Sequence, residues 1–154
     1  MAQFADIPIR IEQSDAQPQS FGNALPILNE IRHALARLAE RGESTRIDLA
    51  AMPFGPGDED RLMTLLGRGE VQASVDALGP TRIWETRFPG IWVLDYANVE
   101  GERIALQIEI DEVPQMLRTQ SADITDSLTA LDAELSSASA ADHGAGSQQS
   151  QTPP

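Results

Sequence analysis

Four short segments between residues 70 and 110 alternate in residue character, and turn residues separate them. Apolar side chains recur at every second position within these segments, which is the period of a β-strand. The segments cover residues 70–78, 81–88, 91–97 and 103–110. Gly79-Pro80 and Pro89-Gly90 predict two of the turns. Because the connections are short, this region predicts an antiparallel meander.

Helical spacing precedes the meander. In residues 22–42 the apolar positions recur at intervals of three and four, which predicts a helix with one apolar stripe: Leu28, Ile31, Leu35 and Leu38. Asn23 is the candidate N-cap, and Pro26 in the first turn loses no hydrogen bond. Gly42 stands where a helix favours a left-handed residue after its end.

The remaining segments complete the fold. Residues 44–50 predict a further strand, and residues 58–66 predict a short helix that Asp58 caps and Gly67 and Gly69 end. A helical segment begins near Pro114, and a last amphipathic helix follows in residues 121–136, with Ser121 as its candidate cap. The order α-β-α-β-β-β-β-α predicts an α+β fold, a mainly antiparallel sheet of about five strands with helices packed on one face.

Both ends of the chain lack the pattern of a packed core. Residues 1–22 predict a flexible arm, in which 7–11 could add a short edge strand. Residues 138–154 are small and polar, which predicts a disordered tail. We therefore expect one α+β domain over residues 23–137.

Composition excludes several kinds of chemistry. All 11 basic residues are Arg, so the chain has no lysine for a Schiff base or a P-loop. It has no Cys, which excludes disulfides, thiol catalysis and thiolate-bound clusters in this chain. With only two His, far apart in the sequence, a histidine metal site or a catalytic triad is not expected. We expect no cofactor.

The charge of the chain bears on its partners. A net charge of −13 disfavours nucleic acid and anionic membranes, because both present negative charge. No apolar run is long enough for a membrane span, and the N-terminus lacks the pattern of a signal peptide. We therefore expect a cytoplasmic protein that binds neither nucleic acid nor membrane.

Carboxylates offer the main alternatives for an enzyme. Glu70 and Glu85 could form a pair on neighbouring strands, although exposed carboxylates beside arginines are the simpler interpretation. Asp58, Glu59 and Asp60 could supply oxygen ligands to a divalent ion, as could the acids of 109–112, but no EF-hand spacing is present. Glycines in 55–57 and 67–69 favour ordinary turns over a phosphate loop, because the acids beside them would repel phosphate.

The aromatic residues concentrate in the third and fourth strand segments. Four of the seven lie between residues 84 and 96. Alternation places Trp84 on one face of the sheet and Glu85 on the other, and on the next strand it separates Val93 from Trp92 and Tyr96. Since helices are expected on one face only, both Trp side chains cannot be assumed buried. We expect one aromatic-bearing face in the core and the opposite face at a partner contact.

An ordered set of short motifs resembles the hydrogenase expression/formation proteins, the HupH/HupJ/HyaF family, in their C-terminal conserved region. The motifs are GNALPILNEIRHAL at 22–35, IDL at 47–49, GPGDEDRL at 55–62, LGRGEVQA at 66–73, ET at 85–86, PGIW at 89–92, IEI at 108–110 and VP at 113–114. The short chain, with one copy of this region, is most similar to the HupJ type. Tyr96 stands near a position where relatives are expected to carry His, which puts a role for His in that strand in doubt.

The resemblance implies a non-enzymatic accessory protein, or chaperone, for maturation of an uptake [NiFe]-hydrogenase. Its implied partners are the precursor of the iron–sulfur small subunit and other hydrogenase accessory proteins, with a homo-oligomer as a further possibility. No catalytic residue is carried over. The alternatives are a carboxylate-based or metal-dependent enzyme, and a structural subunit of a maturation complex held through its last helix. The candidate partner-binding residues are Asp58, Glu59, Asp60, Glu70, Trp84, Glu85, Arg87, Trp92 and Tyr96.

Overall fold

The computed structural model describes residues 22–77 and 79–145. The chain divides into two compact units, residues 1–112 and residues 113–154. In the first unit the elements are α1 (Ala24–Arg41), β1 (Thr45–Asp48), the 3-10 turn η1 (Leu49–Ala51), α2 (Asp58–Leu66), β2 (Gln72–Ala77), β3 (Gly79–Glu85), β4 (Ile91–Ala97) and β5 (Arg103–Ile110). The second unit contains the 3-10 turn η2 (Gln115–Leu117) and the helix α3 (Ser121–Ala145).

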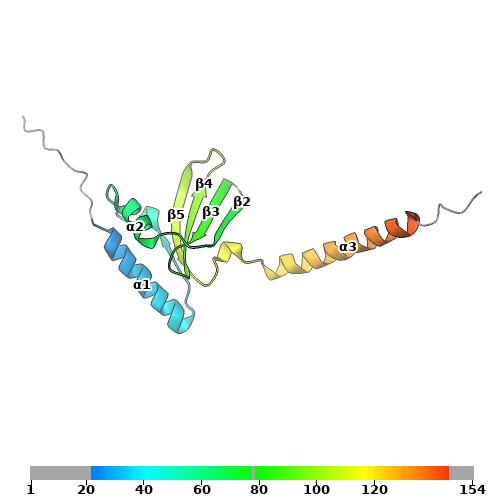
Figure 1. Cartoon of the computed structure of the whole chain (residues 1–154), viewed down its shortest axis with the longest axis horizontal. Coiled ribbons are helices and arrows are strands. Elements are labelled where there is room, and N and C mark those ends of the chain that lie inside the picture. Colours follow the sequence, from blue (N-terminus) through cyan, green and yellow to red (C-terminus); the bar gives the residue numbers. More distant parts are fainter. Residues whose placement is uncertain (1–21, 78, 146–154) are drawn as a thin grey trace, which may run out of the picture. The chain divides into compact units, whose positions relative to one another are not determined.

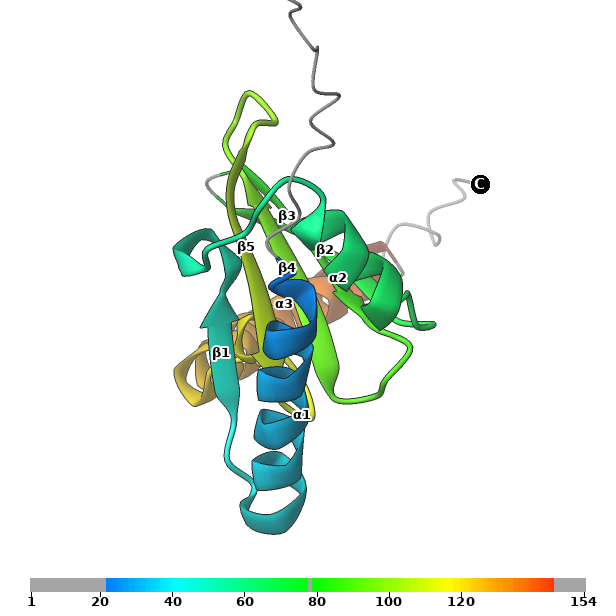
Figure 2. The ribbon, with the colours of Figure 1, turned by 90° about the vertical axis from the view of Figure 1, so that its left-hand side faces the viewer.

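The first unit is a five-stranded antiparallel sheet in the order β1-β5-β4-β3-β2. The helices α1 and α2 lie on one face of this sheet (Figure 1 and Figure 2). The predicted α+β class is confirmed, as is the meander of β2 to β5. Gly79 and Pro80 belong to β3 rather than to a turn, because Gly79 pairs with Ala77 and Pro80 with Asp76.

One row of side chains across the sheet forms the centre of the core. Paired positions place Ile47, Ile108, Val93 and Trp84 side by side on the face that the helices cover. From α1, the small residues Ala24 and Ala34 and the branched residues Ile27 and Ile31 pack into the same cluster. From α2, Leu62 and Leu66 complete it, both without any exposed surface.

The ends of α1 show how local sequence positions it. Asn23 precedes the helix, but its side chain caps nothing; its amide donates instead to the carbonyl of Pro53. Gly42 adopts the predicted left-handed conformation at φ 68° and donates to the Leu38 carbonyl at 2.8 Å. Residue 53 and the start of α1 are thereby tied together.

Two glycines of the 67–69 segment have separate structural roles. Gly67 ends α2 at φ 64°, as predicted, and donates to the carbonyl of Met63. A Cβ at Gly69 would lie 2.5 Å from the Thr86 carbonyl oxygen, because the backbone there runs close to the end of β3. The amide of Gly69 donates to the Glu85 carbonyl at 2.8 Å. The segment is therefore a helix end joined to the sheet, and the amides of both glycines are used in the fold rather than offered to a phosphate.

The second unit differs from the expected helix in length. α3 begins at Ser121 and runs to Ala145, so it includes residues 138–145 of the segment predicted to be disordered. The helical segment predicted near Pro114 is the single 3-10 turn η2. No helix among the described residues is long and apolar enough to cross a bilayer. The edge strand predicted at 7–11 lies outside the described residues.

Candidate functional site

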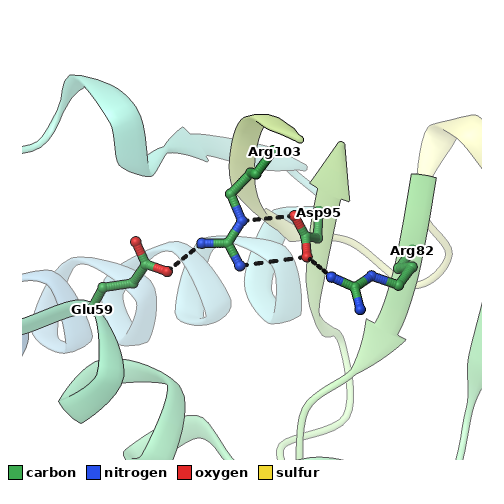
Figure 3. Close-up of polar contacts among 4 residues, drawn as sticks. All are labelled: Glu59, Arg82, Asp95 and Arg103. Atoms are coloured by element: carbon green, nitrogen blue, oxygen red, sulfur yellow. Dashed lines mark hydrogen bonds and ion pairs between the residues drawn. The ribbon is translucent and has the colours of Figure 1, made fainter. Parts of the chain in front are cut away.

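A buried carboxylate on β4 organises the polar end of the covered sheet face (Figure 3). The side chain of Asp95 is 2% exposed. It accepts hydrogen bonds from Nη2 of Arg82 at 2.6 Å and from Nε and Nη2 of Arg103 at 2.8 and 3.4 Å. Arg103 in turn donates through Nη1 to Oε1 of Glu59 at 2.6 Å. We call these four residues the Asp95 cluster.

The sheet register explains why these groups meet. Arg82 on β3 pairs directly with Asp95 on β4, and Leu106 on β5 pairs with Asp95 from the other side. Arg103 is the first residue of β5 and pairs with Ala97, two residues after Asp95 on β4. Glu59 comes from the first turn of α2. The apolar row of the core ends here, and a buried charge takes the next inward position. A buried carboxylate is tolerable only with such charge-assisted partners.

A polar pocket adjoins the Asp95 cluster. Its volume is about 200 Å³, and its lining residues are Glu59, Asp60, Met63, Gly67, Arg68, Arg82, Trp84, Asp95, Arg103 and Leu106. The guanidinium of Arg68 lies 4.4 Å from the centroid of the Trp84 ring, a cation–π distance. We call this site the arginine pocket, because three arginines, Arg68, Arg82 and Arg103, line it together with Trp84.

The partners of Arg103 favour its charged form. The hydrogen bond to Asp95 raises the pKa of Arg103 above its ordinary value; burial opposes this rise, and the bond to Glu59 adds to it. Arg82 is 71% exposed and uses only Nη2 in its bond to Asp95. Arg68 forms no ion pair with any residue that the structure describes. Both side chains thus retain N–H donors for carboxylate or carbonyl oxygens of a bound chain.

Three of the candidate residues predicted from the sequence line this pocket. Trp84 is 8% exposed and belongs to the core cluster, so only part of its ring reaches the pocket. Glu59 is held by Arg103, and Asp60 is exposed in the first turn of α2. Within the acidic run of residues 58–60, the charge of Glu59 is therefore balanced by Arg103 of the same chain.

Asp58 has a structural role instead of the predicted surface role. Its side chain is fully buried, and Oδ2 accepts from the amides of Gly55 at 3.0 Å and Asn23 at 3.3 Å. It is also the first residue of α2, after the N-cap Gly57. A buried carboxylate presents nothing to a partner, so Asp58 is removed from the contact set.

The proposed carboxylate pair is not assembled into the pocket. Glu70 is exposed in the segment before β2, and Glu85 is half-buried at the end of β3. The carboxylate of Glu85 accepts from the amide of Gly90 at 3.2 Å and so supports the β3–β4 connection. Neither Glu lines the arginine pocket. Arg87 is exposed in the same connection, with its guanidinium 4.8 Å from the Phe88 ring centroid.

The opposite sheet face holds the other two candidates. Trp92 and Tyr96 alternate with the inward residues of β4, as predicted. Trp92 is nevertheless only 5% exposed, and its Nε1 donates to the Asp111 carbonyl at 3.1 Å. Both Trp side chains are therefore buried, one on each face. Tyr96 is half-buried near the ion pair of Arg46 and Glu109.

The predicted metal alternative gains no geometric support. Within residues 22–77 and 79–145, no group of three or more His, Asp or Glu side chains is placed to hold a metal ion. In the 109–112 segment, Asp111 accepts from Ser44 Oγ at 2.7 Å and Glu109 pairs with Arg46 at 3.1 Å.

Sequence reasoning missed the centre of the site. Asp95 and Arg82 were placed on strands but given no function, and Arg68 and Arg103 were not singled out. One signal was available: Asp95 follows Ile91 and Val93 at the inward positions of β4, and an acid at such a position requires a cation. The identity of that cation depends on strand pairing, which the sequence left open.

Fold and site together define a class: an antiparallel α+β domain with a polar, arginine-lined pocket at one end of its helix-covered sheet face. The family can be stated more narrowly. The model of the HupH hydrogenase expression protein, C-terminal conserved region, matches residues 21–138, and the chain belongs to this family.

Similar proteins agree with this membership. The chain is 35% identical over 116 residues to the hydrogenase expression/formation protein HoxQ of Azotobacter vinelandii, covering 74% of this chain and 41% of that protein. It is 26% identical over 121 residues to HupH of Rhizobium leguminosarum bv. viciae, covering 79% and 43%. The chain thus spans well under half the length of these relatives. A solved structure of hydrogenase expression protein HupH from Thiobacillus denitrificans is 37% identical, with a TM-score of 0.73 over 77% of this chain and 98% of that one.

Proposed function

We propose that this chain is a non-enzymatic accessory protein for the maturation of an uptake [NiFe]-hydrogenase. In this proposal it acts in the cytoplasm and binds the precursor of the iron–sulfur small subunit. The observation that carries the proposal is the family match over residues 21–138, together with relatives named hydrogenase expression/formation proteins. Because the chain has no Cys, its part would be to hold the subunit that carries the cluster, not the cluster itself.

The arginine pocket is the proposed contact for the small subunit. Arg68 and Arg82 are exposed and line the pocket beside the nearly buried Trp84, and arginine and tryptophan are enriched among the residues that contribute most to binding at protein interfaces. Glu59 and Asp60 on the rim add acceptors for basic groups of the partner. Polar and charged groups at an interface contribute more to the orientation and selectivity of the bound partner than to its affinity.

Affinity capture from cells that make the hydrogenase tests the proposal. The tagged chain is expected to retain the small-subunit precursor, identified by mass spectrometry. The double variant R68A/R82A is expected to retain at most about a tenth as much, the effect of losing about 1.4 kcal/mol of binding. R41A is the matched control, because Arg41 is an exposed arginine that does not line the pocket. Capture without any hydrogenase subunit or accessory protein would count against the role.

A further inference from the structure

A second concave surface lies on the first unit, along α1. Its volume is about 310 Å³, and its lining is almost wholly apolar and includes Leu25, Leu28, Arg32, Leu35 and Phe88. We call it the α1 groove. Leu25 is 47% exposed and Phe88 is 38% exposed. Leu28 and Leu35 pack against the core with one side and remain partly exposed, so the groove is formed by the outer edge of the apolar face of α1.

The helix α3 carries an apolar stripe that packs against no other described residue of its own unit. Ile124, Leu128, Leu131 and Leu135 follow one another at intervals of four, three and four residues, and each is between 58% and 60% exposed. Every side chain from 121 to 141 is exposed. A single helix in water gains little from propensity alone, and proteins stabilise such helices by packing the apolar face.

The two surfaces match in length. Leu25 and Leu35 are ten residues apart on α1, and Ile124 and Leu135 are eleven residues apart on α3. At 1.5 Å per residue, the stripes are about 15 and about 16.5 Å long. A helix laid along the groove could therefore bury its whole stripe.

The charges beside the two surfaces are complementary. Arg32 lines the α1 groove, and Arg87 stacks on Phe88 at its other wall. Neither arginine forms an ion pair with any residue in the described part of the chain. On α3, Asp132 and Glu134 stand on opposite flanks of the stripe, each within about a quarter turn of its centre. Residues 119–154 contain no Arg at all.

We propose that α3 of one copy docks into the α1 groove of a second copy, and that the chain forms a dimer through this reciprocal exchange. Each copy offers one groove and one stripe, so a two-fold arrangement fills both. Pairing of α3 with α3 is disfavoured, because it leaves both grooves empty and lines the contact with Asp132 and Glu134 of both helices, with no basic residue to offset them. The inference is independent of the proposed hydrogenase role.

Disulfide cross-linking provides a direct test, because the chain has no Cys of its own. The single variants L25C and L131C are mixed and oxidised. The expected product has twice the mass of the chain and contains one copy of each variant. A133C replaces L131C in the control, because residue 133 lies on the opposite side of α3 from the stripe, and its yield is expected to be at least fivefold lower.

Three outcomes would overturn the proposal. Equal yields of the disulfide-linked dimer from L131C and from A133C would show that the apolar stripe of α3 is not the face that contacts the groove. Predominant L131C homodimers would show that α3 pairs with itself. A disulfide within single chains of the double variant L25C/L131C, without double-mass product, would show that the groove is filled from the same chain.

Charge exchange supplies a second measurement that does not depend on cysteine chemistry. R32E/R87E and D132R/E134R are each expected to raise the dimer dissociation constant about tenfold in sedimentation velocity, because each replaces the attraction between opposite charges by repulsion. Combining all four changes is expected to restore most of the affinity. R61E is the matched control, since Arg61 is exposed on α2 outside the groove. A monomeric wild-type chain, or failure of the combined variant to recover, would contradict the exchange.

Discussion

Arg103 donates two hydrogen bonds to the carboxylate of Asp95, from Nε to Oδ1 at 2.8 Å and from Nη2 to Oδ2 at 3.4 Å. This two-point contact joins β5 to β4 at the end of the apolar core, where Asp95 is almost completely buried. Arg82 binds the same carboxylate from β3 at 2.6 Å. One buried acid thus links three adjacent strands, and its two cations share the task of neutralising it.

The shared neutralisation predicts non-additive losses of stability. R82Q is expected to cost about 0.5 to 1 kcal/mol, because Arg82 is largely exposed and Arg103 still neutralises Asp95. R103Q is expected to cost about 1 to 2 kcal/mol, because two bonds to Asp95 and one to Glu59 are lost. The double variant leaves a buried, unpaired carboxylate and is expected to cost about 3 to 5 kcal/mol. Urea unfolding measures all three, and additivity within about 0.5 kcal/mol would contradict a shared role.

The buried Asp58 predicts a stability effect that its neighbour lacks. D58A removes the acceptor of the Gly55 and Asn23 amides and is expected to lower the free energy of unfolding by about 2 to 3 kcal/mol. D60A is the control in the same helical turn; with an exposed side chain it is expected to lose less than about 1 kcal/mol, mainly through the helix dipole. Equal losses in thermal or urea unfolding would show that burial of Asp58 has no special role.

Tyr96 predicts a specific dependence of stability on pH. Burial raises the pKa of Tyr96 above its ordinary value of 10.0; Arg46 opposes this rise and Glu109 adds to it. The folded state therefore holds the phenol proton more tightly than the unfolded state. The associated stability is fully present below about pH 10 and falls as the pH rises through the higher folded-state pKa.

The composition of the chain makes this effect easy to isolate. With one Tyr, no Lys and no Cys, the chain has no other side chain that titrates near pH 10. Urea unfolding between about pH 9 and about pH 11 is expected to show a steeper loss for the wild type than for Y96F. The tyrosinate absorbance of the native protein should likewise appear at a higher pH than in urea. Identical slopes for both proteins would refute the assignment.

The sequence predicted the framework of the fold from local patterns. Alternation and turn residues located β2 to β5, and Gly42 marked the end of α1 because a positive φ there is a local requirement. Both predictions, the strand positions and the end of α1, depend only on residues within a few positions along the chain. The place of β1 beside β5, in contrast, joins positions between 59 and 65 residues apart and could not be derived from either segment alone.

The candidate site was less accessible to sequence reasoning for the same reason. Asp58 matches the pattern of a surface N-cap, but the loop that folds over it makes it a buried acceptor. Trp92 was a candidate contact because no helix was expected on its face, yet its indole donates to the carbonyl of Asp111 and is buried. Arg82 and Asp95 meet only through the β3–β4 register, which depends on the length of the connection at 86–90.

Direct binding between the purified chain and the purified small-subunit precursor tests the central claim most closely. Titration calorimetry is expected to give a saturable complex for the wild type and for R41A, and an affinity at least about tenfold weaker for R68A/R82A, with all three proteins equally folded. Binding by R68A/R82A at wild-type strength would remove the arginine pocket from the contact. Absence of binding by the wild type would contradict the proposed role in handling the small subunit.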